Sequence, residues 1–196
     1  VAAPTMAQTL TKPFDVESPE STWQAPDLAE LPSDWWSRLN AGSDEEISHR
    51  YRDFLEAMEQ RVTGLIGDEL VTAQNGISNA KNILDLLVLA RQGSTHIAFE
   101  PPLAKESYIL DDVLGLRTQE RELDTKYAQV ELQIDQAKSQ IWLLQERGDK
   151  LVNEYASLNS EAPARLLVGV KRIASRAEYE LLQERVKNAN EFLKSI

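Results

Sequence analysis

The longest regular pattern in the chain is a heptad repeat of apolar residues within residues 106–159. Apolar side chains recur there at alternating steps of four and three residues, and only Glu120 and Gly148 depart from this rule. The positions of the repeat are Ile109, Val113, Leu116, Glu120, Leu123, Tyr127, Val130, Ile134, Ala137, Ile141, Leu144, Gly148, Leu151, Tyr155 and Leu158. No proline interrupts the pattern, so it predicts one long helix with a single apolar face. Such a helix cannot bury that face alone and needs partner helices.

Two further apolar stripes predict helix within residues 44–92. Ser43 and Glu46 have the spacing of a capping box, which marks the start. The stripes consist of Ile47, Tyr51, Phe54, Leu55, Met58, Val62, Leu65 and Ile66, then of Leu70, Ala73, Ile77, Ala80, Leu84 and Leu87. Gly67 between them is a possible stop, but a glycine costs only about 1 kcal/mol inside a helix. We therefore favour one continuous or kinked helix over two separate ones.

Residues 93–104 separate this helix from the long one. Pro101 and Pro102 forbid helix there and stiffen the segment. A loop of this length is longer than a helical hairpin needs, so we consider Phe99, Pro101 and Pro102 candidate contacts for a partner protein. After the long helix, Ser160 and Pro163 have the residue types of a helix start, which predicts a last helix over residues 161–195.

These elements predict an all-α fold. The two long helices would form an elongated antiparallel hairpin, and the shorter third helix would run back from Leu158 toward about residue 124. Within that span the long helix carries apolar residues outside its repeat, namely Leu132, Trp142, Leu143 and Val152. We expect a second partner to cover them in a three-helix coiled-coil bundle. Over residues 93–123 we expect a thinner two-helix tip, where exposed repeat positions would favour self-association.

The N-terminal part of the chain has no helical pattern. Residues 1–32 hold five of the eight prolines, which predicts an extended or disordered linker before a helical bundle over residues 33–196. A short helix over residues 34–40 carries Trp35 and Trp36, which must point in different directions. One would plug the bundle, and the other would be partly exposed or covered by the linker. Both are candidate partner contacts.

Composition excludes several kinds of function. The formal net charge is −11 and no stretch concentrates Lys and Arg, which argues against a nucleic-acid binder or a scaffold on anionic lipid. The chain has no cysteine, so disulfides, thiolate metal sites and thiol catalysis are excluded. The longest apolar run, residues 83–90, is interrupted by Asp85 and is too short to cross a membrane. The start Val-Ala-Ala-Pro fits either a removed signal peptide or an excised fragment.

No constellation of residues indicates catalysis or a cofactor. Glu46 and His49 form one Glu-x-x-His motif, but a di-iron bundle needs two such motifs and further inward glutamates. His96 has no partner at ligand spacing, and neither a phosphate loop nor a nucleophile motif is present. Glu120, at an apolar position of the repeat, either sets the register or reaches water at the thin tip; we prefer the second interpretation and retain it as a candidate contact. We predict no enzyme, no metal and no cofactor.

Three segments carry a resemblance to a known family. They are DLAELPSDWW at 27–36, YRDFLEAM at 51–58 and IWLLQER at 141–147, after a proline-rich start and among long heptad helices. In style and order the chain resembles the periplasmic N-terminal region of large bacterial mechanosensitive channels of the small-conductance type. The resemblance implies a periplasmic location, a signal peptide before residue 1 and transmembrane helices after residue 196. It carries over no site residue, because pore and lipid contacts would lie outside this chain.

The sequence thus predicts a non-catalytic helical domain that serves assembly or regulation of a membrane-anchored protein, by self-association or by mechanical coupling along the rod. The alternative is a free-standing coiled-coil adaptor that binds a protein partner with its tip or with the tryptophan pair.

Overall fold

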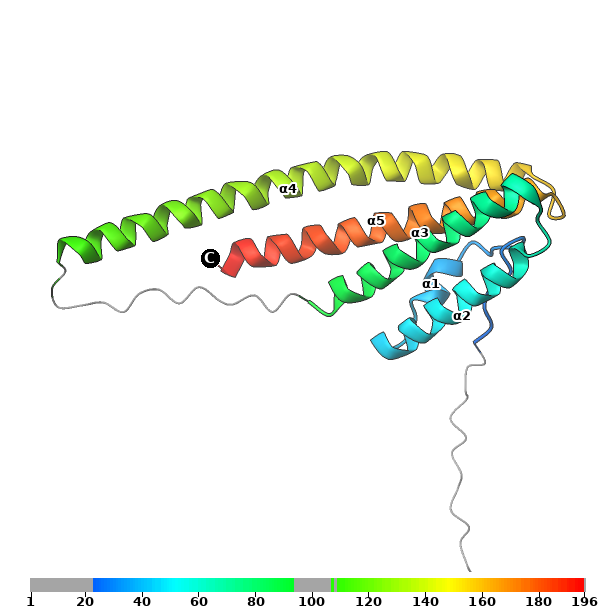
Figure 1. Ribbon diagram of the computed structural model, residues 1–196, viewed down its shortest axis with the longest axis horizontal. Coiled ribbons are helices and arrows are strands. Elements are labelled where there is room, and N and C mark those ends of the chain that lie inside the picture. The colour runs from blue at the N-terminus through cyan, green and yellow to red at the C-terminus, as the bar shows by residue number, and fades with distance from the viewer. Residues whose placement is uncertain (1–22, 94–106, 108, 196) are drawn as a thin grey trace, which may run out of the picture.

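The computed structural model describes residues 23–93, 107 and 109–195 (Figure 1). These residues form α1 (Trp35–Leu39), α2 (Asp44–Val62), α3 (Gly67–Arg91), α4 (Leu110–Ser157) and α5 (Pro163–Ser195). No strand occurs in this part of the chain. The predicted all-α class is confirmed, and the heptad repeat lies on the single long helix α4, as expected.

The central element is α5, the last helix. Both α3 and α4 pack extensively along α5, whereas α2 packs against α3 and α1 against α2. Figure 1 shows α4 arching along one side of α5, with α3 and α2 on the other side. The pairing between residues 44–92 and 106–159 that we expected is therefore wrong for the described residues. The apolar stripe of α3 serves α5 instead, so the order of helices is α2, α3, α5, α4.

The chain also breaks where a continuous helix was favoured. α2 ends at Val62 and α3 begins at Gly67, and α2 folds back along α3. Gly67 has a φ of +60°, a left-handed conformation that residues with a Cβ adopt only at a cost. The Thr63 hydroxyl donates to the Gln60 carbonyl at 2.7 Å and helps to terminate α2. Two antiparallel helices replace one kinked rod.

The main core lies among α1, α2, α3 and α5. Its most completely buried large side chains are Leu28, Leu39, Phe54, Met58, Val62, Leu84, Leu87, Val170 and Ile173. Burying a side chain of this size stabilises the fold by about 1.5–3 kcal/mol. The heptad positions of α4 join the buried set only toward its C-terminal end, at Ile134, Leu144, Leu151 and Tyr155.

The linker prediction for residues 1–32 is wrong for its last part, since residues 23–32 belong to the fold. Leu28, Ala29 and Leu31 are buried, and Leu28 and Leu31 join the main core. Residues 1–22 lie outside the described part.

Candidate interaction surfaces

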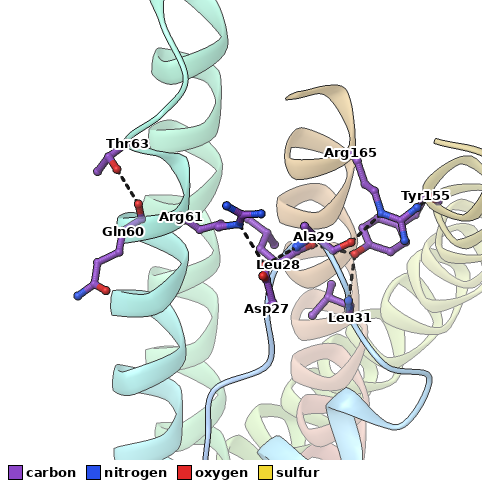
Figure 2. A network of polar contacts seen from close by, with 9 residues as sticks. All are labelled: Asp27, Leu28, Ala29, Leu31, Gln60, Arg61, Thr63, Tyr155 and Arg165. Carbon is purple, nitrogen blue, oxygen red and sulfur yellow. Dashed lines mark hydrogen bonds and ion pairs between the residues drawn. The ribbon is translucent and has the colours of Figure 1, made fainter. Parts of the chain in front are cut away.

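Residues 27–31, here called the N-terminal strap, are fixed to the end of the molecule where α4 turns into α5 (Figure 2). The Tyr155 hydroxyl donates to the Leu28 carbonyl at 2.8 Å and accepts from the Leu31 amide at 3.0 Å. Arg165 Nε on α5 donates to the Ala29 carbonyl at 2.7 Å, and Arg165 Nη1 donates to the Tyr155 carbonyl at 3.1 Å. One tyrosine and one arginine therefore join three segments of the chain.

A glycine on α5 makes room for the strap. A Cβ at Gly169 would lie 2.9 Å from Leu28 Cδ1 and 3.0 Å from the Leu28 carbonyl oxygen. These distances are too short for an undisturbed contact, so the close approach of strap and helix depends on the missing side chain. Sequence reasoning missed this arrangement, although Leu28 and Leu31 offered a faint signal as two apolar residues among the prolines.

The tryptophan pair divides between core and surface. Trp35 is 3% exposed and lies edge-to-face against Trp36, with ring centroids 5.2 Å apart. Trp36 is half-buried and stacks on Tyr51 with centroids 6.5 Å apart. Of the two candidate contacts, Trp35 serves the core and only Trp36 retains an accessible side.

Trp36 borders a crevice of about 350 Å³ between α1, α4 and α5. The crevice opens beside Gly148, where nothing lies within 4 Å of an added Cβ. Arg176 lies 5.8 Å over the Trp36 ring and is ion-paired with Glu180 at 2.6 Å. Arg176 is therefore held between Glu180 and the Trp36 ring. Arg172 also lines the crevice, and burial lowers the pKa of its guanidinium.

A second polar network connects α1, α2 and α3. The Tyr51 hydroxyl donates to Asn40 Oδ1, and the Arg91 guanidinium donates to Asn40 Oδ1 at 2.8 Å and to the Tyr51 oxygen at 3.1 Å. Burial raises the pKa of Tyr51 to about 12, and the nearby Arg91 charge only partly offsets this. The network connects the ends of α1 and α3 to the middle of α2.

The Glu46–His49 motif has a structural role. Glu46 accepts from the Ser43 amide at 2.7 Å, and the Glu46 amide donates to Ser43 Oγ at 3.4 Å, which completes the predicted capping box. The Ser43 backbone hydrogen bond holds the pKa of Glu46 below its usual value. Among the described residues no three His, Cys, Asp or Glu side chains cluster in a way that could hold a metal ion.

Residues 109–127, here called the α4 arm, extend beyond the end of α5 (Figure 1). Val130, the next repeat position after this arm, borders a groove of about 630 Å³ together with Phe192 of α5. Farther along the arm Tyr127 is 44% exposed, Val113 39% and Ile109 65%. Glu120 is exposed, in agreement with the interpretation that it reaches water. The other candidate contacts of this tip, Phe99, Pro101 and Pro102, lie outside the described residues.

The apolar residues outside the repeat of α4 have no second partner in the described structure. Leu132, Trp142, Leu143 and Val152 are between 42% and 63% exposed. The expected burial of these side chains in a three-helix bundle is therefore wrong for this part of the chain, because α3 packs on the far side of α5. Their exposure makes α4 the helix with the most uncovered apolar surface.

Comparison with protein-family models, curated proteins and solved structures found no match for the chain. The resemblance to mechanosensitive channels accordingly stays a prediction. In the described ranges no helix combines the length and hydropathy of a membrane span.

Proposed function

We propose that this chain is a non-catalytic helical domain that serves assembly or regulation by presenting α4 to another protein surface. The carrying observation is the apolar surface that α4 leaves uncovered, along the arm and at four large side chains outside the repeat. Several large apolar side chains exposed along one helix of a folded domain suggest a protein interaction site. The remainder of the molecule, with α5 packed on both sides, would hold α4 in place.

The resemblance extends this proposal to a location. We propose the periplasmic part of a membrane-anchored protein, of the small-conductance mechanosensitive channel type. The order of linker, tryptophan pair and long helices supports it. The reading frame after the codon for Ile196 tests it: an apolar span of about 20 residues is expected. A stop codon at that point would contradict the channel proposal and leave the interaction role intact.

A free-standing adaptor is the second candidate, and the crevice beside Trp36 favours it. An aromatic side chain with one accessible side next to a crevice is a common anchor for a partner's side chain. Trp36→Ala should abolish partner binding in this case, whereas binding through the α4 arm, which does not line the crevice, should survive the substitution.

Site-specific photo-crosslinking of the full-length protein in its own cells tests the interaction role directly. A photoreactive residue at Leu123, Leu132 or Trp142 should give one defined protein adduct. The same residue at Glu56 or Glu59, on the exposed side of α2, provides the matched control. Absence of any adduct at the α4 positions, or equal adducts at all five, would argue against the proposal.

A further inference from the structure

The α4 arm has a feature that neither the exposed apolar surface nor the resemblance explains. Its apolar repeat keeps the heptad spacing over residues 109–127, although the first buried side chain of α4 is Ile134 and α4 continues beyond the end of α5 (Figure 1). Leu116 and Leu123 point to the same side of the helix as the buried Ile134 and Leu144. A coiled-coil face without a partner in the described chain is therefore continuous with one that has a partner.

We propose that the α4 arm pairs with the same arm of a second copy of the chain, as an antiparallel two-helix coiled coil around a two-fold axis at Thr118. This inference deepens the proposed function and rests on it, since it names the partner of one surface of α4. A two-fold axis makes the contact self-complementary, so each residue pair occurs twice.

The antiparallel orientation follows from where α5 lies. In a parallel pair both copies of α5 would meet at the same end, where α5 already occupies the repeat of its own α4 at Val130. A parallel pair would also place Glu120 against Glu120 of the second copy, and like charges in an apolar contact are unfavourable. In an antiparallel pair the two main bodies lie at opposite ends and do not compete for the repeat.

The length of the free repeat determines the register. With the axis at Thr118, Val113 lies level with Leu123 of the second copy and Ile109 level with its Tyr127, so four of the five apolar positions have an apolar neighbour and only Leu116 lies level with Glu120. If the second arm were shifted by one heptad toward the body of the first chain, its Ile109 would enter the groove beside Phe192 of the first chain. A slip the other way would leave Tyr127 uncovered.

The charges of the arm fit this register. Glu120 lies level with Leu116 of the second copy, and the adjacent Arg117 brings a guanidinium within reach of the carboxylate. The two arginines thus lie on either side of the axis, and each is next to the glutamate of the other copy. At each end Lys126 lies level with Leu110 of the other copy, two residues from the level of its Asp112. Glu120 reaches water in the single chain. In the pair its contact with Arg117 would fix the register, as a charged residue at one apolar position can do.

The pair is short, so we expect a weak dimer with a Kd of about 0.1 mM. Sedimentation equilibrium of the 196-residue chain up to about 0.5 mM should show the average mass rising from 22.1 kDa toward twice that value. Leu116→Asp should remain monomeric with unchanged helix content. Leu143→Asp, on the exposed side outside the repeat, is the matched control and should still dimerise. A wild-type monomer at every concentration, or a dimer that only Leu143→Asp disrupts, would overturn the inference.

Charge exchange tests the register without a large change in apolar surface. Arg117→Glu and Glu120→Arg should each weaken the dimer at least about tenfold, because like charges then meet across the axis. The double variant restores opposite charges and should dimerise nearly as well as the wild type. Failure of the double variant to recover would contradict the proposed register.

Electron–electron distance measurements test the orientation, and the absence of cysteine simplifies labelling. Thr118 and Thr125 are matched sites, because both are exposed on α4 and each hydroxyl donates to the carbonyl four residues before it. In the antiparallel pair the two labels at Thr118 are level, whereas those at Thr125 are displaced by about 21 Å along the axis. Equal distances at both sites would show a parallel pair and sink the proposal. Adducts with a different protein on a strictly monomeric chain would refute this inference alone and leave the proposed function standing.

Discussion

Tyr51 illustrates how single residues in this molecule serve packing. Its ring stacks on Trp36, and its hydroxyl lies between Asn40 and Arg91. Burial favours the neutral phenol, which is why the pKa rises to about 12. The residue was predicted as part of an apolar stripe, but its polar partners come from α1 and from the far end of α3. An apolar stripe predicts which face of a helix is buried, but it does not predict the hydrogen-bond partners of a tyrosine hydroxyl on that face.

The raised pKa of Tyr51 predicts a loss of stability at high pH. The unfolded chain releases this proton near pH 10 and the folded chain near pH 12, so stability is unaffected below pH 10 and falls by up to about 2 kcal/mol as pH rises to 12. Tyr51→Phe lacks this proton. Urea unfolding at pH 8 and 11.5 gives the free energy of unfolding of both proteins. The stability advantage of the wild type over the variant should be smaller at the higher pH. An unchanged difference would mean that the phenol is not held in its neutral form.

Two glycines on neighbouring helices predict opposite effects of the same substitution. At Gly148 nothing lies within 4 Å of an added Cβ, so Gly148→Ala should raise the free energy of unfolding by about 0.5–1 kcal/mol through helix propensity. Gly169→Ala should lower it, since its Cβ would collide with Leu28. Thermal unfolding compares the two variants. Stabilisation by both would show that strap and α5 are farther apart than described.

At the scale of elements, the strap is the part of the fold that the sequence pattern concealed. Five prolines within residues 1–32 suggested a linker, and that composition outweighed the two leucines. Leu28 and Leu31 are held in place by Tyr155 and Gly169, which belong to distant parts of the chain. The hydrogen bonds to Tyr155 alone span more than 120 residues. A local pattern holds no information about a contact of that kind.

The helices themselves were more predictable than their pairing. The heptad spacing predicted α4, and the capping box predicted the start of α2, because both signals are local. The break before Gly67 depends on a positive φ that the sequence does not display. The choice of α5 over α4 as the neighbour of α3 depends on which apolar faces meet, and several faces were compatible with each other.

Removing the Tyr155 hydroxyl tests the strap. Tyr155→Phe leaves the Leu28 carbonyl and the Leu31 amide without their partner, and such a loss costs about 1–3 kcal/mol for buried groups. Tyr127→Phe is the matched control on the same helix, because Tyr127 is 44% exposed. Chemical denaturation should therefore show that the free energy of unfolding of Tyr155→Phe is lower than that of Tyr127→Phe by more than about 1 kcal/mol. Equal free energies of unfolding for the two variants would mean that the strap does not contact Tyr155 in solution.

At the scale of the whole molecule, α4 has two different parts. From Ile134 to Tyr155 its repeat is covered by α5 and contributes buried side chains. From Ile109 to Tyr127 the same repeat contributes no buried side chain, and we infer that a second copy covers it. The molecule would then consist of a stable body and an arm whose order depends on association. In a membrane-anchored assembly, high local concentration would favour even a weak pair of arms.

Hydrogen exchange of the α4 amides as a function of protein concentration tests this division most directly. Helix ends and segments with few buried contacts open more readily than packed ones. At low micromolar concentration, amides of residues 113–127 should exchange fast and those of residues 134–155 slowly. Near 0.5 mM, about five times the expected Kd, the arm should become protected while the rest stays unchanged. Protection that is uniform along α4 at the lowest concentration, or an arm that remains unprotected at the highest, would contradict the account.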